Sequence, residues 1–549
     1  MLELIFFSIL AIIILAPCGY IFNTHKNNNI ISLSNDLIYG LILISFITLL
    51  INFFAPLNII INSLILIFPL IVIFNNKKYY FSTNFFKFVI FNSIIVFLLM
   101  AKSNIYRPDA ILYHLPYTSI LNEEKIIFGL SNLHFRYAHV SIIQYFSSFF
   151  NNFIFGYKGI TFSIAIVASS VIINFLAYLI KYLKNKKFNF HFFYLFFILI
   201  FISYKMNRYG EYGNDAPTHF LFFFLISEII QSFKDKKILY SANNFILAVF
   251  IVLNKITMAF AIFLPFLFLK KNELSKMFII PKNYFGIIFL SLWVFKNIII
   301  SGCAIYPVSK LCLQNLEWSN VYQAKNVSQE NEAWTKAWPD YKNTDNISQA
   351  EYSKDFNWVD TWSKTHLLKI NKILLPYFIL LTFIYLFIYF KFKNKNIIPN
   401  SFHNRKYLIL ILLMVVFSII WFLKVPVYRY GYSYFVSFLA LGFAYLCILN
   451  NSIKKKAYKF FRFFLILFAT VFVLKNLLRI VKPEEINRNN FFPKIIFINK
   501  SKIKKIELEH FSYNESVEMC GYNYAPCTHY LNQKLKSKKY YNYKVFLPN

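Results

Sequence analysis

Asp109 and His114 lie close together in the segment Tyr106–Pro116, which reads Y-R-P-D-A-I-L-Y-H-L-P. The segment follows a long apolar run, so both side chains are expected at the end of a membrane span. A carboxylate there can remove the proton from a hydroxyl group that then acts as a nucleophile. The competing interpretation is structural, because an aspartate before a short helix often caps its N-terminus. In an arbitrary protein, the helix cap would be the favoured interpretation of Asp109.

Three further charged residues lie beside apolar runs. Asp215 precedes Ala216-Pro217, which can open a helix, so it is predicted at a helix N-terminus near the membrane surface. Lys255 marks either a tight outward turn, which alternating threading favours, or a costly charge within the membrane beside a functional cavity. Arg429 lies among three tyrosines, where a guanidinium either binds phosphate or extends to the membrane interface.

His114 and Arg136 are weaker candidates that could bind phosphate or position Asp109, although a lone interfacial histidine is more often structural. Two pairs of cysteines are also close in sequence. Cys520 and Cys527 could form a disulfide in an oxidising compartment, and so could Cys303 and Cys312. The pair near the C-terminus is favoured, but the spacing leaves unpaired thiols open.

The sequence lacks the characteristic motifs of several enzyme classes. The chain has 12 glycines and no glycine-rich phosphate loop, which argues against ATP-driven transport and nicotinamide chemistry. It has no His-Glu-x-x-His helix and no nucleophile elbow, so membrane metalloproteases and serine hydrolases are not supported. No set of metal ligands is predicted. Acid–base chemistry near the membrane surface remains.

The composition indicates a membrane protein. Hydrophobic residues make up 58% of the chain, with 68 phenylalanines and a mean hydropathy of +0.50, which is more apolar surface than a soluble core can bury. The net charge of +34 would suggest nucleic acid in a soluble protein. Here the basic residues form short runs between apolar stretches, so the positive-inside rule explains many of them and no nucleic-acid partner is predicted.

The sequence therefore predicts an all-α polytopic bundle of about 12 to 14 spans. The apolar runs begin near Leu2, Leu37, Ile59, Phe86, Ile160, Phe190, Ala216, Phe245, Met258, Tyr284, Ile373, Tyr407, Phe435 and Phe461. Under alternating threading, the basic runs 77–78, 181–187, 234–237, 270–276, 391–395 and 454–462 all fall on one side, which is assigned to the cytoplasm.

Three long segments then face outward. The first outward loop is 103–158, the large outward loop is 301–368, and the tail 481–549 is predicted to be a small extracytoplasmic α/β domain with a few strands. Residues 1–480 would form the transmembrane domain. Apolar periodicity near residues 140–150 predicts a helix lying on the membrane surface.

Five short motifs occur in order, each on the predicted outward side. They are D-A-I-L-Y-H-L-P from Asp109, G-L-S-N-L-H-F-R from Gly129, G-N-D-A-P from Gly213, W-F-L-K-V-P-V-Y-R-Y-G from Trp421 and C-G-Y-N-Y-A-P-C from Cys520. In these motifs and in its organisation, the chain resembles the GT-C superfamily of polytopic glycosyltransferases, and more closely a bacterial family of GT-C-like membrane proteins. The resemblance implies a GT-C-like bundle in the bacterial inner membrane, with its active face in the periplasm.

The resemblance also implies roles for individual residues. Asp109 would be the general base, and Asp215 a second acidic residue that supports acceptor or donor, with the involvement of a divalent cation left open. Arg429 would bind the donor phosphate, with His114, Arg136 and Lys255 as further phosphate or substrate contacts. The donor would be a polyprenyl-phosphate sugar, and the acceptor a glycan, a lipid or a protein of the cell envelope.

Two other functions remain open from the sequence. An O-antigen polymerase or ligase also combines many spans with a large outward loop, and it would place catalysis in 301–368. A flippase or transporter for lipid-linked glycans would need charged residues that line the bundle, and the predicted spans contain few.

Overall fold

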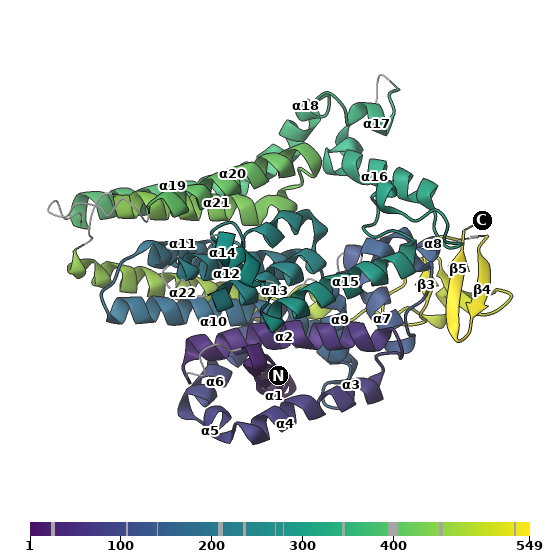
Figure 1. Ribbon diagram of the computed structural model, residues 1–549, viewed down its shortest axis with the longest axis horizontal. Coiled ribbons are helices and arrows are strands. Elements are labelled where there is room, and N and C mark those ends of the chain that lie inside the picture. The colour runs from purple at the N-terminus through teal and green to yellow at the C-terminus, as the bar shows by residue number, and fades with distance from the viewer. Residues whose placement is uncertain are drawn as a thin grey trace.

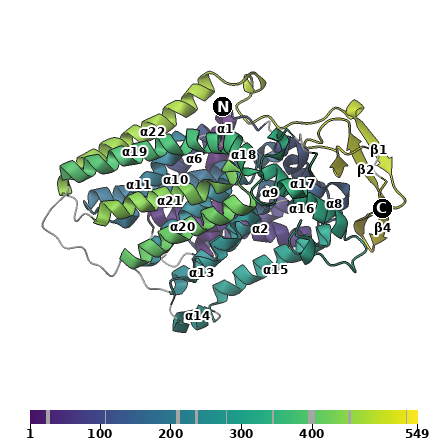
Figure 2. The same ribbon diagram turned by 90° about the horizontal axis from the view of Figure 1, so that it is seen from above.

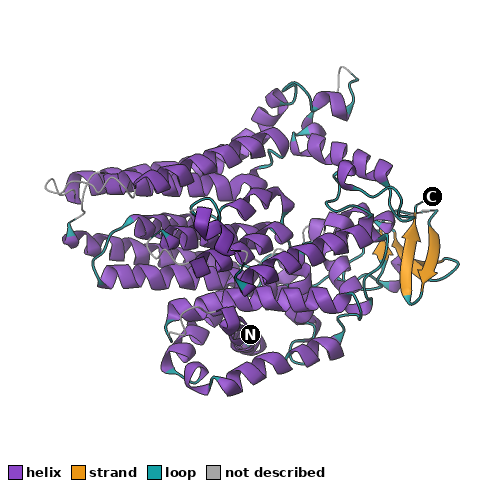
Figure 3. Ribbon diagram, in the orientation of Figure 1, coloured by secondary structure: helices purple, strands orange, loops and turns teal. Residues whose placement is uncertain are grey.

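The computed structural model describes residues 1–22, 28–105, 108–139, 141–206, 212–233, 238–269, 271–277, 279–342, 346–392, 404–449, 454–531 and 534–548. Long helices run side by side along the longest axis of the molecule, and the strands gather at one end of it (Figure 1). Figure 3 shows that the strands are confined to that end and that helices make up nearly all of the rest.

Nine helices among the described residues are long and apolar enough to cross a membrane. They are α1 (Leu2–Cys18), α2 (Ile30–Asn52), α6 (Thr83–Met100), α10 (Phe162–Lys184), α15 (Pro281–Ser301), α19 (Leu368–Phe392), α20 (Asn404–Lys424), α21 (Tyr428–Leu449) and α22 (Tyr458–Val481). Large apolar side chains on these helices are exposed, including Phe390 at 80% and Leu478 at 62%. Such exposed apolar surface fits a lipid environment, so the polytopic class is supported.

The predicted 12 to 14 spans exceed these nine. Several of the other apolar runs form shorter or less apolar helices: α3 (Ile59–Ile65), α4 (Ile67–Asn75), α11 (Phe190–Tyr204), α12 (Asp215–Ser232) and α13 (Ile238–Asn254). The run at Met258 forms the 3₁₀ helix Ile256–Phe263 and turns. In α11, every side chain from Phe190 to Ser203 is buried. An all-apolar helix can therefore be enclosed by other helices, and hydropathy does not separate this case from exposure to lipid.

The two ends of the bundle differ in composition. The basic end carries α5 (Lys77–Tyr80), α14 (Lys271–Met277) and the described parts of the lysine-rich runs. Contacts join these parts, since Lys454 N–H donates to the carbonyl of Phe392 and Lys186 Nζ lies 5.3 Å from the Tyr458 ring. These contacts place the run 454–462 beside the runs 181–187 and 391–395, as alternating threading predicts, while residues 234–237, 270 and 393–395 lie outside the described residues.

The other end is the loop end, where the long connections fold. The first outward loop forms the π-helical turn Ala110–His114, α7 (Leu115–Glu123), α8 (Leu130–Leu133), the 3₁₀ helix Phe135–His139 and α9 (Ile142–Phe149). The large outward loop forms α16 (Val321–Thr335), α17 (Gln349–Tyr352) and α18 (Val359–Trp362). Figure 2 shows these elements grouped on the side of the bundle that faces the strands.

The prediction that a helix near residues 140–150 lies on the membrane surface is wrong. All side chains from Ile142 to Phe149 in α9 are buried. The helix packs against α2, α7 and α13, and Ser147 Oγ donates to Ser163 Oγ on α10 at 2.7 Å. Neighbouring helices cover its polar as well as its apolar face, so its amphipathic pattern marks a buried helix with internal hydrogen bonds.

The described residues of the C-terminal segment form five strands. The antiparallel pair β1 (Ile503–Glu507) and β2 (Ser512–Ser516) continues in the short parallel strand β3 (Cys527–Thr528), and β4 (Lys536–Tyr540) pairs antiparallel with β5 (Tyr543–Leu547). Among its described residues only 3₁₀ turns accompany the strands, so the small sheet is confirmed and the predicted α-helical part is not found.

This segment is bonded to the first outward loop rather than standing apart from the bundle. Phe128 N–H donates to the carbonyl of Lys544, and Phe546 N–H donates to the carbonyl of Phe128. Gly521 N–H donates to the carbonyl of Ile111, two residues after Asp109. The tail therefore helps to hold the loop that carries the predicted catalytic residue.

Candidate functional site

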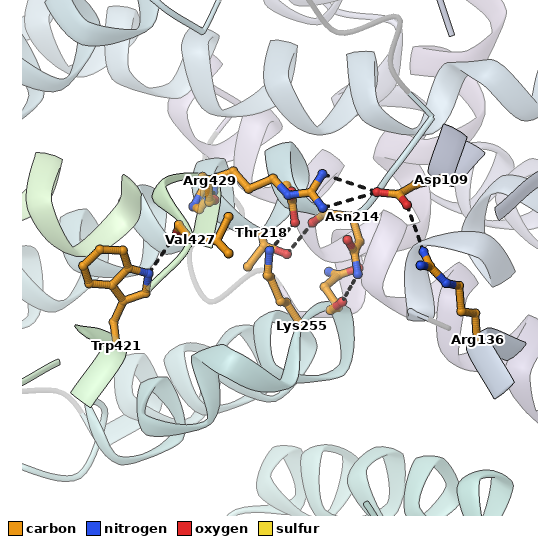
Figure 4. Close-up of polar contacts among 11 residues, drawn as sticks. Asp109, Arg136, Asn214, Thr218, Lys255, Trp421, Val427 and Arg429 are labelled. Atoms are coloured by element: carbon orange, nitrogen blue, oxygen red, sulfur yellow. Dashed lines mark hydrogen bonds and ion pairs between the residues drawn. The ribbon is translucent and has the colours of Figure 1, made fainter. Parts of the chain in front are cut away.

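Five of the predicted site residues are joined by ion pairs at the loop end, and Figure 4 labels Asp109, Arg136, Lys255 and Arg429 among them. We call Asp109, Arg136, Asp215, Lys255 and Arg429 the charged cluster. They come from five separate parts of the chain: the start of the π-helical turn, the 3₁₀ helix Phe135–His139, the first residue of α12, the residue after α13, and the second residue of α21. Only the tertiary fold brings together residues as far apart in sequence as Asp109 and Arg429.

Asp109 is held by two arginines. Arg136 Nη1 donates to its Oδ1 at 3.1 Å, while Arg429 Nη1 and Nη2 both donate to its Oδ2 at 3.3 Å. Asp109 precedes the π-helical turn, but its side chain makes no cap hydrogen bond. The helix-cap interpretation is therefore wrong, and the carboxylate is directed toward cations from distant segments.

Asp215 is the first residue of α12, so its predicted place at a helix N-terminus is confirmed. Lys255 Nζ donates to its Oδ1, and Arg429 Nε lies 3.6 Å from its Oδ2. Arg429 thus bridges the two carboxylates, and it is not a lone cation extending to the membrane interface. A guanidinium suits this position because its donors form a fixed planar fork.

Lys255 follows the last residue of α13 directly and precedes the 3₁₀ helix, as the turn interpretation predicts. It is also 93% buried, since its side chain is only 7% exposed. Neighbouring amides hold this turn in place: Asn214 Nδ2 donates to the carbonyl of Asn254 at 3.0 Å, and Ser141 Oγ donates to Asn254 Oδ1 at 3.0 Å. Lys255 is therefore both a turn residue and a buried charge.

The motif around Arg429 forms a rigid turn between α20 and α21. Trp421 Nε1 donates to the carbonyl of Val427 at 3.0 Å, and Trp362 Nε1 donates to the carbonyl of Pro426 at 2.6 Å. The backbone at Gly431 lies against the Trp421 ring, where a Cβ would come within 2.8 Å of it. These indoles satisfy backbone carbonyls in the turn and so fix the start of α21.

Aromatic rings border the cations. Lys255 Nζ lies 3.6 Å from the centre of the Tyr430 ring. The Arg429 guanidinium carbon lies 5.4 Å from Tyr430 and 5.7 Å from Trp334, which is 45% exposed and belongs to α16 of the large outward loop. These distances are in the range of cation–π interactions.

His114 lies beside the cluster without bonding to Asp109. Its Nδ1 pairs with Gln144 Nε2 at 2.6 Å, so Nδ1 accepts from the amide. Burial lowers the pKa of His114 to about 4, a change that the nearby Asp109 and Asp215 only partly offset. The imidazole is therefore neutral near pH 7 and is better suited to positioning than to binding phosphate.

The cluster is partly open to solvent and carries excess positive charge. Asp109 is 30% exposed, Arg429 35% and Arg136 36%. Three cations face two carboxylates, which leaves one net positive charge. Both oxygens of Asp215 already meet cations, and no group of three or more His, Cys, Asp or Glu side chains in the described residues could hold a metal ion. The residues do not fit a divalent cation here, whereas an anionic group fits.

The sequence did not single out His219, whose imidazole contacts the backbone of Arg429. Its Nε2 lies 2.7 Å from the carbonyl oxygen of Arg429, and its Nδ1 pairs with Ser433 Oγ. The signal was its spacing, because His219 follows Asp215 by four residues and so shares its face of α12. Gln144, Asn214 and Asn254 were also missed, since single amides carry no distinctive pattern.

Both cysteine pairs are disulfide-bonded in the structure, Cys303 with Cys312 and Cys520 with Cys527. The first bond closes a loop after α15. The second closes the turn that contains Gly521, whose N–H donates to the carbonyl of Ile111. The second disulfide therefore constrains the backbone that contacts the Asp109 turn.

Residues 1–436 match the family described as Domain of unknown function (DUF8201). The match covers well over half of the 549 residues. The chain belongs to this family. All five residues of the charged cluster lie inside the matched range, whereas the five strands lie beyond it. No curated protein and no solved structure matches the chain.

Proposed function

We propose that this protein is a membrane glycosyltransferase. In this proposal it moves a sugar from a polyprenyl-phosphate-linked donor to an acceptor on the extracytoplasmic side, and Asp109 is the general base. The observation that carries the proposal is the position of Asp109 between Arg136 and Arg429, at the loop end of an apolar helical bundle. A base and a phosphate-binding arginine are thereby in direct contact.

The donor phosphate would bind on the Arg429 side. Arg429 and Lys255 are adjacent through Asp215, and guanidinium donors bind phosphate oxygens in pairs. The net positive charge of the cluster favours an anion at this place. The exposed apolar faces of the surrounding helices are compatible with a lipid tail that remains in the bilayer.

Phosphate binding would also prepare the base. In the structure Arg429 holds Asp109 Oδ2 with two donors. An incoming phosphate competes for those donors, so Oδ2 would be released when the donor is bound. Asp109 then accepts the proton of the acceptor hydroxyl as its oxygen attacks the anomeric carbon. The sugar–phosphate bond breaks, the polyprenyl phosphate leaves with the electron pair, and the configuration at the sugar inverts.

The positions of the five charged residues in the sequence favour catalysis at the charged cluster over catalysis in the large outward loop. None of the five charged residues belongs to 301–368, and the loop approaches the cluster through the aromatic ring of Trp334. A polymerase or ligase that acts through that loop would need ionisable groups from it at the cluster. The proposed orientation, with the loop end outside the cytoplasmic membrane, rests on the basic residues at the opposite end.

The test is sugar transfer from a panel of radiolabelled polyprenyl-phosphate sugars into membranes that contain the full chain or Asp109→Asn at matched expression. We expect transfer by the wild type and loss of about 10²- to 10⁴-fold in the variant, the usual contribution of a general base. Asp360→Asn is the matched control, because Asp360 is 74% exposed and its ion pair among the described residues is with Lys364, four residues further along the chain. Equal transfer by wild type and Asp109→Asn would refute the assigned base.

A further inference from the structure

A second group of side chains lies on the other side of Asp109. Arg136 reaches Asp109 with Nη1, and its guanidinium carbon lies 5.6 Å from the Phe135 ring. Phe135 belongs to a set of rings from three distant segments, which we call the histidine–aromatic cluster: His134, Phe135, His139, Tyr306, His529 and Tyr530. It joins the first outward loop, the large outward loop and the tail.

The rings of this cluster stack in a partly exposed layer. His134 stacks on Phe135 at 5.5 Å and on Tyr530 at 4.8 Å, with interplanar angles of 17° and 21°. Phe135 and Tyr530 are themselves stacked at 20°. Phe135, Tyr530 and His529 are all neither buried nor fully exposed. Part of each of these three side chains is therefore open to solvent beside Arg136.

The histidines of the cluster are neutral. Burial lowers the pKa of His134 to about 2 and that of His139 to about 4, and the Arg136 charge acts in the same direction on both. Burial and Arg136 also lower the pKa of His529. A neutral imidazole both donates and accepts hydrogen bonds, as hydroxyl groups require.

The hydrogen bonds fix which nitrogen donates. Arg136 N–H donates to His134 Nδ1 at 3.1 Å, so the proton of neutral His134 is on Nε2. His134 Nε2 then donates to His529 Nδ1 at 3.2 Å, which leaves Nε2–H as the donor of neutral His529. Among the described residues, Tyr306 Oη has no hydrogen-bond partner, although its side chain is 95% buried and its ring lies 5.3 Å from His139. An unpaired buried hydroxyl costs about 1–3 kcal/mol, so it points to a missing ligand.

From these contacts we infer that the histidine–aromatic cluster is the acceptor subsite and that it binds a neutral carbohydrate. Sugar faces would pack on Phe135 and Tyr530, while sugar hydroxyls would pair with Tyr306 and His529. Arg136 links this subsite to Asp109 Oδ1, and Arg429 links Asp109 Oδ2 to the donor side. The inference rests on the proposed function, and it narrows the acceptor from glycan, lipid or protein to glycan.

The test measures binding without a donor, so it does not depend on transfer. Purified full-length protein in detergent is titrated with maltotriose, chitotriose and mannotriose, and binding is followed by saturation-transfer NMR. We expect at least one trisaccharide to bind and Tyr530→Ala to weaken it about tenfold through lost ring contact. Tyr306→Phe removes only a hydroxyl, so it keeps the fold and should weaken binding about threefold.

Tyr541→Ala is the matched control, because Tyr541 lies in the same tail and is 95% exposed. It should bind like the wild type. Binding by none of the three trisaccharides, or equal binding by wild type, Tyr530→Ala and Tyr306→Phe, would overturn the inference. Trisaccharide binding without any sugar transfer would refute the proposed function but not the acceptor subsite. Sugar transfer by Tyr530→Ala with an unchanged KM for the acceptor would refute the acceptor subsite but not the proposed function.

Discussion

The two ends of the helical bundle both collect polar side chains, but they use them differently. At the basic end, Asp36 is 1% exposed and accepts from Tyr79 Oη at 2.8 Å. His191 is also 1% exposed, and it pairs with Tyr182 Oη at 3.0 Å and Ser227 Oγ at 2.7 Å. At the loop end, Asp109 is 30% exposed and pairs with two arginines.

The difference separates a structural network from a site. Asp36 and His191 are buried and bonded to neighbouring side chains, and buried hydrogen bonds of this kind specify one packing. The charged cluster has one net positive charge and donors that a phosphate can take over, so it can exchange its internal bonds for bonds to a substrate. Substitutions at the basic end should therefore affect stability, and those at the loop end should affect activity.

The largest expected effect comes from exchanging the two aspartates for asparagine. Asp109→Asn should lower sugar transfer about 10²- to 10⁴-fold with little change in the thermal unfolding midpoint. Asp36→Asn should instead lower the midpoint and leave transfer per folded molecule unchanged, because a buried hydrogen bond is weakened. Transfer and thermal unfolding in detergent are measured on the same preparations. If fully folded Asp36→Asn lost sugar transfer, the basic end would also take part in activity, and the contrast between the two ends would be wrong.

Arg429→Lys tests whether the fork of donors matters beyond its charge. Lysine keeps the positive charge but cannot bond Asp109, Asp215 and a phosphate together, so we expect the KM for the donor to rise about tenfold or more. Donor titrations at saturating acceptor measure this change. Arg405→Lys, in α20 at the basic end, is the control, and it should match the wild type.

His191→Ala should act on stability alone. It leaves Tyr182 and Ser227 without their shared partner inside the bundle, which costs about 1–3 kcal/mol. The thermal midpoint should fall, and activity at low temperature should not change. A variant with normal stability and impaired transfer would show that the basic end also takes part in function.

The loop end should also give stability a pH dependence. The pKa of His134 is about 2 in the folded chain, below its ordinary value of 6.5. Unfolded chains therefore bind a proton that the folded chain does not, so stability is complete above about pH 6.5 and declines as the pH falls. At pH 5 the loss is about 2 kcal/mol for this histidine. His134→Gln should show a smaller decrease in thermal midpoint between pH 7.5 and pH 5, and an unchanged decrease would refute the assignment.

The family match adds a second contrast between regions. The charged cluster lies within residues 1–436, whereas His529 and Tyr530 lie beyond that range. Donor chemistry would therefore be a property of the shared domain, and acceptor choice would depend on the tail. This division is expected only if both the proposed function and the acceptor subsite hold.

Some predictions succeeded because the pattern along the chain has a direct physical cause. Asp215 before Ala-Pro predicted a helix N-terminus, and the basic runs predicted which helix ends lie together. Other predictions failed because they depended on which helix faces other helices cover. Hydropathy could not separate the enclosed helix α11 from a lipid-exposed span, and the amphipathic pattern of α9 gave no sign that protein covers both of its faces.

The sequence by itself determined that the chain forms long apolar helices, where its basic and polar connections lie, and which ionisable residues are candidates for chemistry. These properties follow from composition and local spacing. Only the tertiary structure decided that Asp109 bonds to Arg136 and Arg429 instead of capping a helix. It also decided that His529 of the tail meets His134 of the first outward loop. Such pairings join residues hundreds of positions apart, so they depend on how the helices and the tail pack rather than on any local pattern.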